Sequence, residues 1–167
     1  TAIAADGTLQ AGSTTALGAT SKLQVEPTGL FDLNGFDNTV GTLIDGIGGL
    51  GVITNSGAAA TLSVGDGLFT GTLAGGANFN LVKNTSGTLT LAGASNYTGT
   101  TLVSAGTLLV TGTLGNTAVS VASGATLGGS GGTLGGSVNV ASGGFLGGTL
   151  TIAGTVTSSG DIGPGNS

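Results

Sequence analysis

The carboxylates are the side chains of this sequence best suited to acid/base or metal chemistry. Its 167 residues include no His and no Cys, so neither an imidazole nor a thiol can act as base, nucleophile or metal ligand. Asp45 and Asp66 are 21 residues apart. If the chain repeats at about that length, the two carboxylates would share one face, as an acid/base pair or a cation site. The acidic candidates are Glu26, Asp32, Asp37, Asp45 and Asp66.

Local context argues against catalysis by these residues. Four of the five flank Gly, Pro or Asn, in expected turns where a carboxylate caps backbone N–H groups. The chain also has no Arg that could orient a sugar acid. We therefore expect turn-capping or solubilising carboxylates, with no catalytic, cofactor-binding or metal-binding residue and no cofactor. A polysaccharide-active enzyme that uses Asp45 and Asp66 is the alternative.

Two glycine motifs overlap at residues 46–51. These residues fit the dinucleotide-binding pattern G-x-G-x-x-G, but residues 52–57 predict a strand and a turn, so no helix N-terminus follows to hold a pyrophosphate. A calcium-binding pattern G-G-x-G-x-D would begin at Gly48, yet Ile53 stands in place of its aspartate. Both matches are interpreted as structural.

Short strands are the elements that must position all of these residues. Residues 61–64, 87–93, 137–140 and 149–152 alternate apolar and polar side chains, which is the periodicity of a β-strand. The 37 glycines disfavour helix throughout. We expect essentially no α-helix.

The strands repeat along the chain. Residues 119–129 match residues 138–148 at 8 of 11 positions, with an offset of 19. This predicts an all-β solenoid of about eight coils of 19–21 residues, with Leu, Val and Ile inside and Thr, Ser and Asn outside. Stepping by that spacing gives an expected inward ladder of Ile3, Leu23, Leu43, Leu62, Leu81, Leu102, Val121 and Val140.

Charge and aromatic content limit the partners. The net charge is −5, and the two cations, Lys22 and Lys83, are expected on solvated turns and are too few to neutralise a nucleic acid. No apolar stretch is long enough to span a bilayer. Because neither end carries a charged or proline-rich cap, we expect the native chain to continue beyond both. The aromatic residues are expected to pack in the core: Phe31, Phe36, Phe69, Phe79, Tyr97 and Phe145.

Residues 81–110, read LVKNTSGTLTLAGASNYTGTTLVSAGTLLV, closely resemble the autotransporter-associated β-strand repeat. Residues 29–40, 52–57 and 160–167 also look like autotransporter passenger sequence. The residues that carry the repeat motif are Gly87, Thr88, Leu89, Leu91, Gly93, Asn96, Tyr97, Thr98, Gly99, Gly106, Thr107 and Leu108.

The resemblance implies a right-handed parallel β-helix on the surface of a Gram-negative cell. Residues 1–167 would form a single solenoid segment of a longer passenger that has a C-terminal outer-membrane barrel. The implied function is a rigid stalk or scaffold for adhesion, cell aggregation or biofilm. Its partners would be a host or neighbouring-cell surface, glycans or a second copy, and a self-associating extracellular filament is a further alternative.

Overall fold

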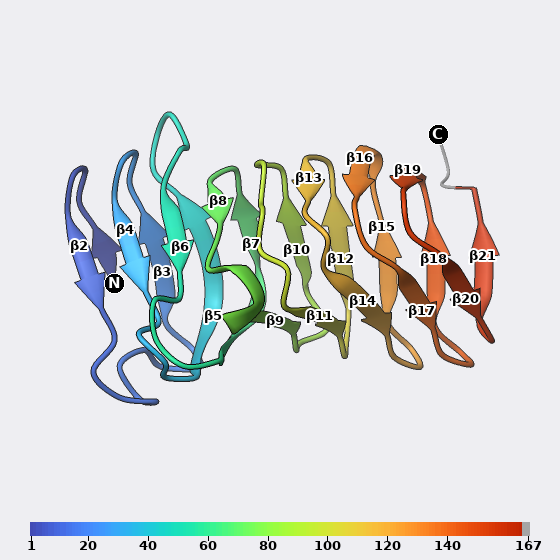
Figure 1. Ribbon diagram of the computed structural model, residues 1–167, viewed down its shortest axis with the longest axis horizontal. Helices are drawn as coiled ribbons and strands as arrows, with labels where there is room; N and C mark the ends of the chain where they lie inside the picture. The colour runs from blue at the N-terminus through green and yellow to red at the C-terminus, as the bar shows by residue number, and fades with distance from the viewer. Residues whose placement is uncertain (165–167) are drawn as a thin grey trace.

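The computed structural model describes residues 1–164, which form an elongated β-solenoid of about nine turns (Figure 1). Neighbouring strands pair in parallel from coil to coil. Within residues 1–164 the helical content is a single 3-10 turn, η1 (Gly76–Asn78). The predicted all-β class, the parallel β-solenoid and the near absence of α-helix are therefore confirmed. Of the terminal segment 160–167, residues 165–167 lie outside the described part.

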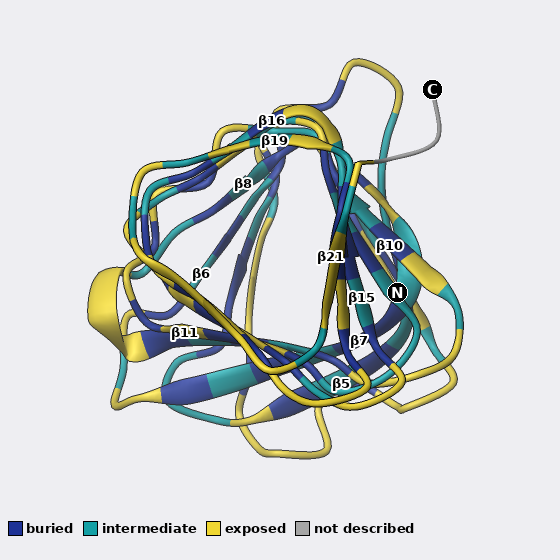
Figure 2. Ribbon diagram, turned by 90° about the vertical axis from the view of Figure 1, so that its right-hand side faces the viewer, coloured by how far each residue is buried: buried dark blue, intermediate teal, exposed yellow. Residues whose placement is uncertain are grey.

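Each coil runs around three faces, which give the solenoid a triangular cross-section (Figure 2). The first face holds β9 (Phe79–Lys83), β11 (Thr100–Val103), β14 (Ala118–Val121), β17 (Val138–Val140) and β20 (Val156–Ser158). The second holds β1 (Ala2–Ile3), β3 (Lys22–Val25), β10 (Thr88–Leu91), β12 (Thr107–Val110), β15 (Thr126–Gly128), β18 (Phe145–Gly147) and β21 (Asp161–Gly163). The third holds β2 (Thr8–Gln10), β4 (Leu30–Asp32), β6 (Val52–Thr54), β8 (Thr72–Leu73), β13 (Thr113–Leu114), β16 (Ser130–Leu134) and β19 (Thr149–Ile152).

Two long strands cross the corner between the first and second faces. They are β5 (Asn38–Asp45) and β7 (Ala60–Phe69). Residues 60–64 of β7 pair with β9 on the first face, whereas residues 67–69 pair with β10 on the second. The two faces are therefore one continuous sheet bent at this corner.

Inward side chains stack in rows along the solenoid axis. On the second face Leu89, Leu108 and Leu127 occupy equivalent positions in successive coils, and none has any exposed surface. Each such buried leucine contributes roughly 1.5–3 kcal/mol relative to an exposed one. The alternation seen in the sequence thus produces buried rows that successive coils extend.

Coil length varies more than the sequence predicted. The offset of 19 is confirmed where Val119 pairs with Val138. The first half of the chain has longer coils, and Asn38 pairs with Leu62, an offset of 24. Near the C-terminal end Phe145 pairs with Asp161, an offset of 16.

The predicted inward ladder is partly wrong for this reason. Its steps Leu23 to Leu43, Leu62 to Leu81 and Val121 to Val140 are true register pairs. Leu43, however, pairs with Gly67, and Leu81 pairs with Thr101. Leu102 therefore points outward and is 37% exposed, because a shift of one residue turns a strand side chain to the opposite face.

Candidate functional surfaces

The structure does not bring Asp45 and Asp66 together as a pair. In the β5–β7 ladder Asp66 lies opposite Thr42, and the hydroxyl of Thr42 donates to its carboxylate at 2.7 Å. Asp45 ends β5 three residues farther along, about 10 Å at the rise of a strand. Its carboxylate accepts the backbone N–H groups of Thr70 and Gly71, the latter at 3.3 Å. Both carboxylates thus hold neighbouring coils together.

Asp32 plays the same role inside a corner of the solenoid. It is 6% exposed and accepts hydrogen bonds from Gln10, from the backbone of Asn34, and from both the backbone and the hydroxyl of Ser56. Burial by itself would raise the pKa of Asp32, but these hydrogen bonds, led by those of Ser56, lower it below its usual value. The carboxylate therefore joins three successive coils.

Of the other candidate carboxylates, Asp37 also joins two coils, whereas Glu26 bonds a residue of its own coil. Asp37 accepts the backbone N–H of Thr61 at 2.7 Å, and Glu26 accepts the side-chain amide of Gln24 at 2.5 Å. The predicted turn-capping role is confirmed for Asp32, Asp37 and Asp45. Among residues 1–164 no group of three or more His, Cys, Asp or Glu side chains is arranged to hold a metal ion.

Lys83 lies in the core, so its predicted place on a solvated turn is wrong. It has no exposed surface and sits in an inward row between Val64 and Val103. Its ammonium group donates to the carbonyl oxygens of Thr85 and Ala105, the latter at 3.2 Å. Burial lowers the pKa of Lys83, and the charge of Asp66 partly opposes that shift. The alternation of residues 79–83 carries the signal, because Lys83 is two residues after Leu81, which points inward.

The repeat-motif residues build core and coil contacts. Leu89, Leu91 and Leu108 are buried in inward rows, while Thr88 and Thr107 pair on the outer surface of the second face. Gly93 lies at a corner, where an added Cβ would come 2.0 Å from the Gly71 carbonyl oxygen. Gly87 faces Asp66, and Gly106 adopts a φ of +65°.

Tyr97, also in the motif, is fully buried between coils. Its hydroxyl shares a hydrogen bond of 2.6 Å with the hydroxyl of Thr101, which in turn bonds Thr117 at 2.9 Å. Its ring meets that of Phe79 edge-on, with centroids 5.2 Å apart. Burial raises the pKa of Tyr97 to about 12. Asn96 and Thr98 flank it with exposed side chains, and Gly99 follows it in the core.

The expected packing of aromatic residues is confirmed with one exception. Phe31, Phe69 and Phe79 have no exposed surface, and Phe36 is partly buried against the core. Phe145 instead points outward from β18 and is 37% exposed.

Residues 46–51, which carried both glycine motifs, form a projecting loop between β5 and β6. No helix follows it, and Ile53, at the position of the calcium-binding aspartate, is buried on the third face. The helix N-terminus and the aspartate that these two motifs require are therefore missing from this loop. At the tip Ile47 is 100% exposed and Leu50 is 73% exposed.

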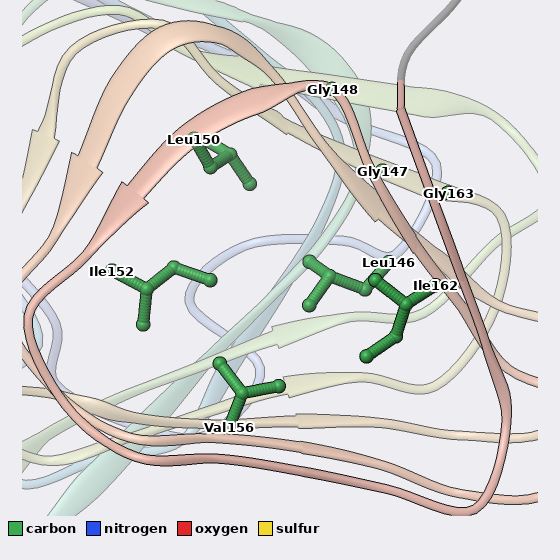
Figure 3. Close-up of a pocket in the computed structure, with 8 residues that line it drawn as sticks. All are labelled: Leu146, Gly147, Gly148, Leu150, Ile152, Val156, Ile162 and Gly163. Atoms are coloured by element: carbon green, nitrogen blue, oxygen red, sulfur yellow. The ribbon is translucent and has the colours of Figure 1, made fainter.

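The C-terminal end of the solenoid exposes its core. Leu146, Ile152, Val156 and Ile162 surround an apolar cavity of about 290 Å³ (Figure 3). Val138 is completely buried, whereas its register partner Val156 in the last coil is 39% exposed.

Comparison with known proteins agrees with this architecture. A family model described as passenger-associated-transport-repeat matches residues 81–110. A curated relative, the "Adhesin BmaC autotransporter" of Brucella suis biovar 1 (strain 1330), is 41% identical over 104 residues. The chain is thus similar to a passenger segment of an autotransporter. The alignment covers 59% of this chain and 3% of the relative's length. No solved structure gives a significant match.

These similarities indicate a location on the surface of a Gram-negative bacterium, outside the cell. An autotransporter passenger is associated with a C-terminal outer-membrane translocator in the full-length protein. Within residues 1–164 of the chain, no helix is long and apolar enough to cross a membrane.

Proposed function

We propose that the chain is a rigid structural and adhesive scaffold, and that residues 1–167 form one solenoid unit of a longer passenger. The observation that carries the proposal is the continuity of the 14-stranded sheet, in which each coil pairs with the next through about nine turns. At about 4.8 Å per coil these turns span roughly 40 Å. A stack in which every coil templates the next resists bending and holds its surface in a fixed geometry.

The exterior suits contact with other surfaces through many weak interactions. On the second face Thr88, Thr107 and Thr126 lie in register and present hydroxyl groups about 4.8 Å apart. Few charged groups interrupt this surface, because charged residues make up 5% of the chain. The similarity to a protein named an adhesin supports an adhesive role with a host surface, a neighbouring cell or glycans as partner, in aggregation or biofilm. We propose no catalytic role.

The test compares two deletions in the full-length protein displayed on bacteria. Removing residues 107–144 joins Gly106 directly to Phe145 and takes out two coils in register. Display and adhesion to a cell-coated surface should persist, with the passenger shortened by about 10 Å. Removing residues 107–134 joins coils out of register and should abolish both protease resistance and adhesion. Adhesion that survives the second deletion unchanged would contradict a scaffold role.

A further inference from the structure

The projecting loop has an apolar tip that nothing within residues 1–164 covers. Ile47 and Leu50 stand out from a surface otherwise built mostly of Thr, Ser, Asn and Gly. Figure 1 shows the loop that leads into β6 rising beyond the neighbouring turns. Leu50 is held at a φ of +71°, a conformation that costs energy for a leucine. Two apolar side chains exposed together at the tip of one loop form a candidate contact surface.

The base of the loop is fixed in place. Asp45 accepts backbone N–H groups of Thr70 and Gly71 in the next coil, and Gly49 donates to the Gly46 carbonyl oxygen at 3.3 Å. Gly49 lies so close to Thr70 that an added Cβ would come 2.2 Å from its hydroxyl oxygen. The apolar tip is therefore presented in a defined direction, which lowers the entropy lost on binding.

The same corner carries an apolar hollow farther along the solenoid. The residues that line it include Leu109, Phe145, Gly128, Gly147, Thr111 and Ser130. Its volume is about 300 Å³, roughly that of ten water molecules in the liquid. The hollow exists because glycines replace side chains in an outward row.

Register places the loop and the hollow at equivalent positions across the second face. The outward row that contains Ile44 continues through Leu68, Thr90 and Leu109 to Gly128. The hollow centres on β15, four strands from β5 in the sheet order, or about 19 Å along the axis. A two-fold axis that lies across this face would therefore bring the loop of each copy onto the hollow of the other.

Charge distribution favours this antiparallel arrangement. Seven of the nine charged residues lie within residues 1–66, and beyond them are Asp161 and the buried Lys83. Copies side by side in parallel register would oppose their acidic halves, which is unfavourable. In the antiparallel pair the acidic half of each copy faces the half of its partner whose one exposed charge is Asp161.

We propose that two copies of the chain associate antiparallel through the second face, with Ile47 and Leu50 of each copy seated in the hollow of the other. The contact is isologous, so it closes as a dimer. This inference goes beyond the scaffold function. The scaffold function depends on coil stacking alone, so failure of the dimer would not affect it.

Sedimentation of the 167-residue chain from micromolar to millimolar concentration should show a monomer–dimer equilibrium. Ile47→Ser should raise the dissociation constant at least tenfold without altering the fold, since the side chain is fully exposed. Ile162→Ser, at the exposed C-terminal end, is the matched control and should leave it unchanged. A monomer at every concentration, or a dimer weakened only by Ile162→Ser, would overturn the proposal. If the chain forms no dimer but binds phosphatidylcholine vesicles through Ile47, the proposal is also overturned, and the loop binds a lipid surface instead.

Cysteine cross-linking tests the arrangement of the two copies. Because the sequence contains no Cys, only the introduced cysteines can form a disulfide. The double variant Ile47→Cys with Ser130→Cys should form a covalent dimer on mild oxidation. Each single variant should not, because like positions lie about 19 Å apart across the two-fold axis and a disulfide needs Cα atoms within about 7 Å. A ladder of larger species would indicate staggered parallel copies and refute the two-fold arrangement.

Discussion

Gly99 sets the spacing between two coils, so replacing it with alanine should destabilise the solenoid. An added Cβ at Gly99 would lie 2.0 Å from the Phe79 carbonyl oxygen and 2.9 Å from the Asn80 side-chain oxygen. Backbone of the preceding coil cannot move aside as a flexible side chain could. Overpacking of this kind costs about 1–3 kcal/mol, and more where backbone must shift. We expect Gly99→Ala to lose at least about 2 kcal/mol.

Gly12→Ala is the matched control, because its added Cβ would meet nothing within 4 Å. Where the backbone tolerates it, this same chemical change gains about 0.4–1 kcal/mol by restricting the unfolded chain. Urea unfolding followed by far-UV circular dichroism measures both variants, with the m-value as a check on cooperativity. If Gly99→Ala and Gly12→Ala differ by less than about 0.5 kcal/mol, close approach at Gly99 does not set the coil spacing.

Two buried ionisable groups give further predictions. Lys83 has a lowered pKa in the folded state, so the unfolded chain binds more protons as pH rises toward 10.5, and stability should increase over that window. Lys83→Met should abolish the increase, whereas Lys22→Met should keep it; equal pH profiles for Lys83→Met and wild type would disprove a buried charge. Tyr97 has its pKa raised to about 12, so stability present below pH 10 should fall as pH rises from about 10 to 12. Tyr97→Phe removes the hydrogen bond to Thr101 and should cost about 1 kcal/mol; phenolate absorbance of the single tyrosine near pH 10 in the folded protein would refute its burial.

The sequence predicts the class of fold well because strand alternation and coil repetition are both local signals. Where two coils have equal length, as at residues 119–129 and 138–148, the offset of 19 gives the true register of Val119 and Val138. A fixed period fails where coil length changes. The offset is 24 between β5 and β7, and it is 20 between Leu81 and its partner Thr101, so the assumed step of 21 from Leu81 ends on the outward Leu102.

The location of Lys83 was predicted wrongly because the prediction used its residue type and not its position in the strand alternation. A lysine is expected at the surface by its charge, yet the alternation of residues 79–83 turns Lys83 inward beside Leu81. Two carbonyl oxygens accept hydrogen bonds from its ammonium group. That of Thr85 is close in sequence, whereas that of Ala105 is 22 residues away. A partner that distant becomes visible only when the coils are stacked.

The loop and the hollow at the corner of the second face could not be predicted from the sequence either, because the residues that form them become neighbours only when the coils stack. Residues 46–51 read as glycine-rich sequence, and nothing local indicates that Ile47 stands clear of the surface. The hollow requires Gly128 and Gly147 to be neighbours in an outward row while Leu109 and Phe145 border them. Those relations depend on register across three coils.

The parallel stacking also determines how the passenger would respond to tension. Pulled from one end, a solenoid gives way a coil at a time, since each coil contacts only its neighbours. A coil of 19 residues, the offset between β12 and β15, releases about 65 Å of extended chain when it detaches. A short rod on a cell surface can therefore lengthen many-fold under shear, and each detached coil can restack on the template left behind it.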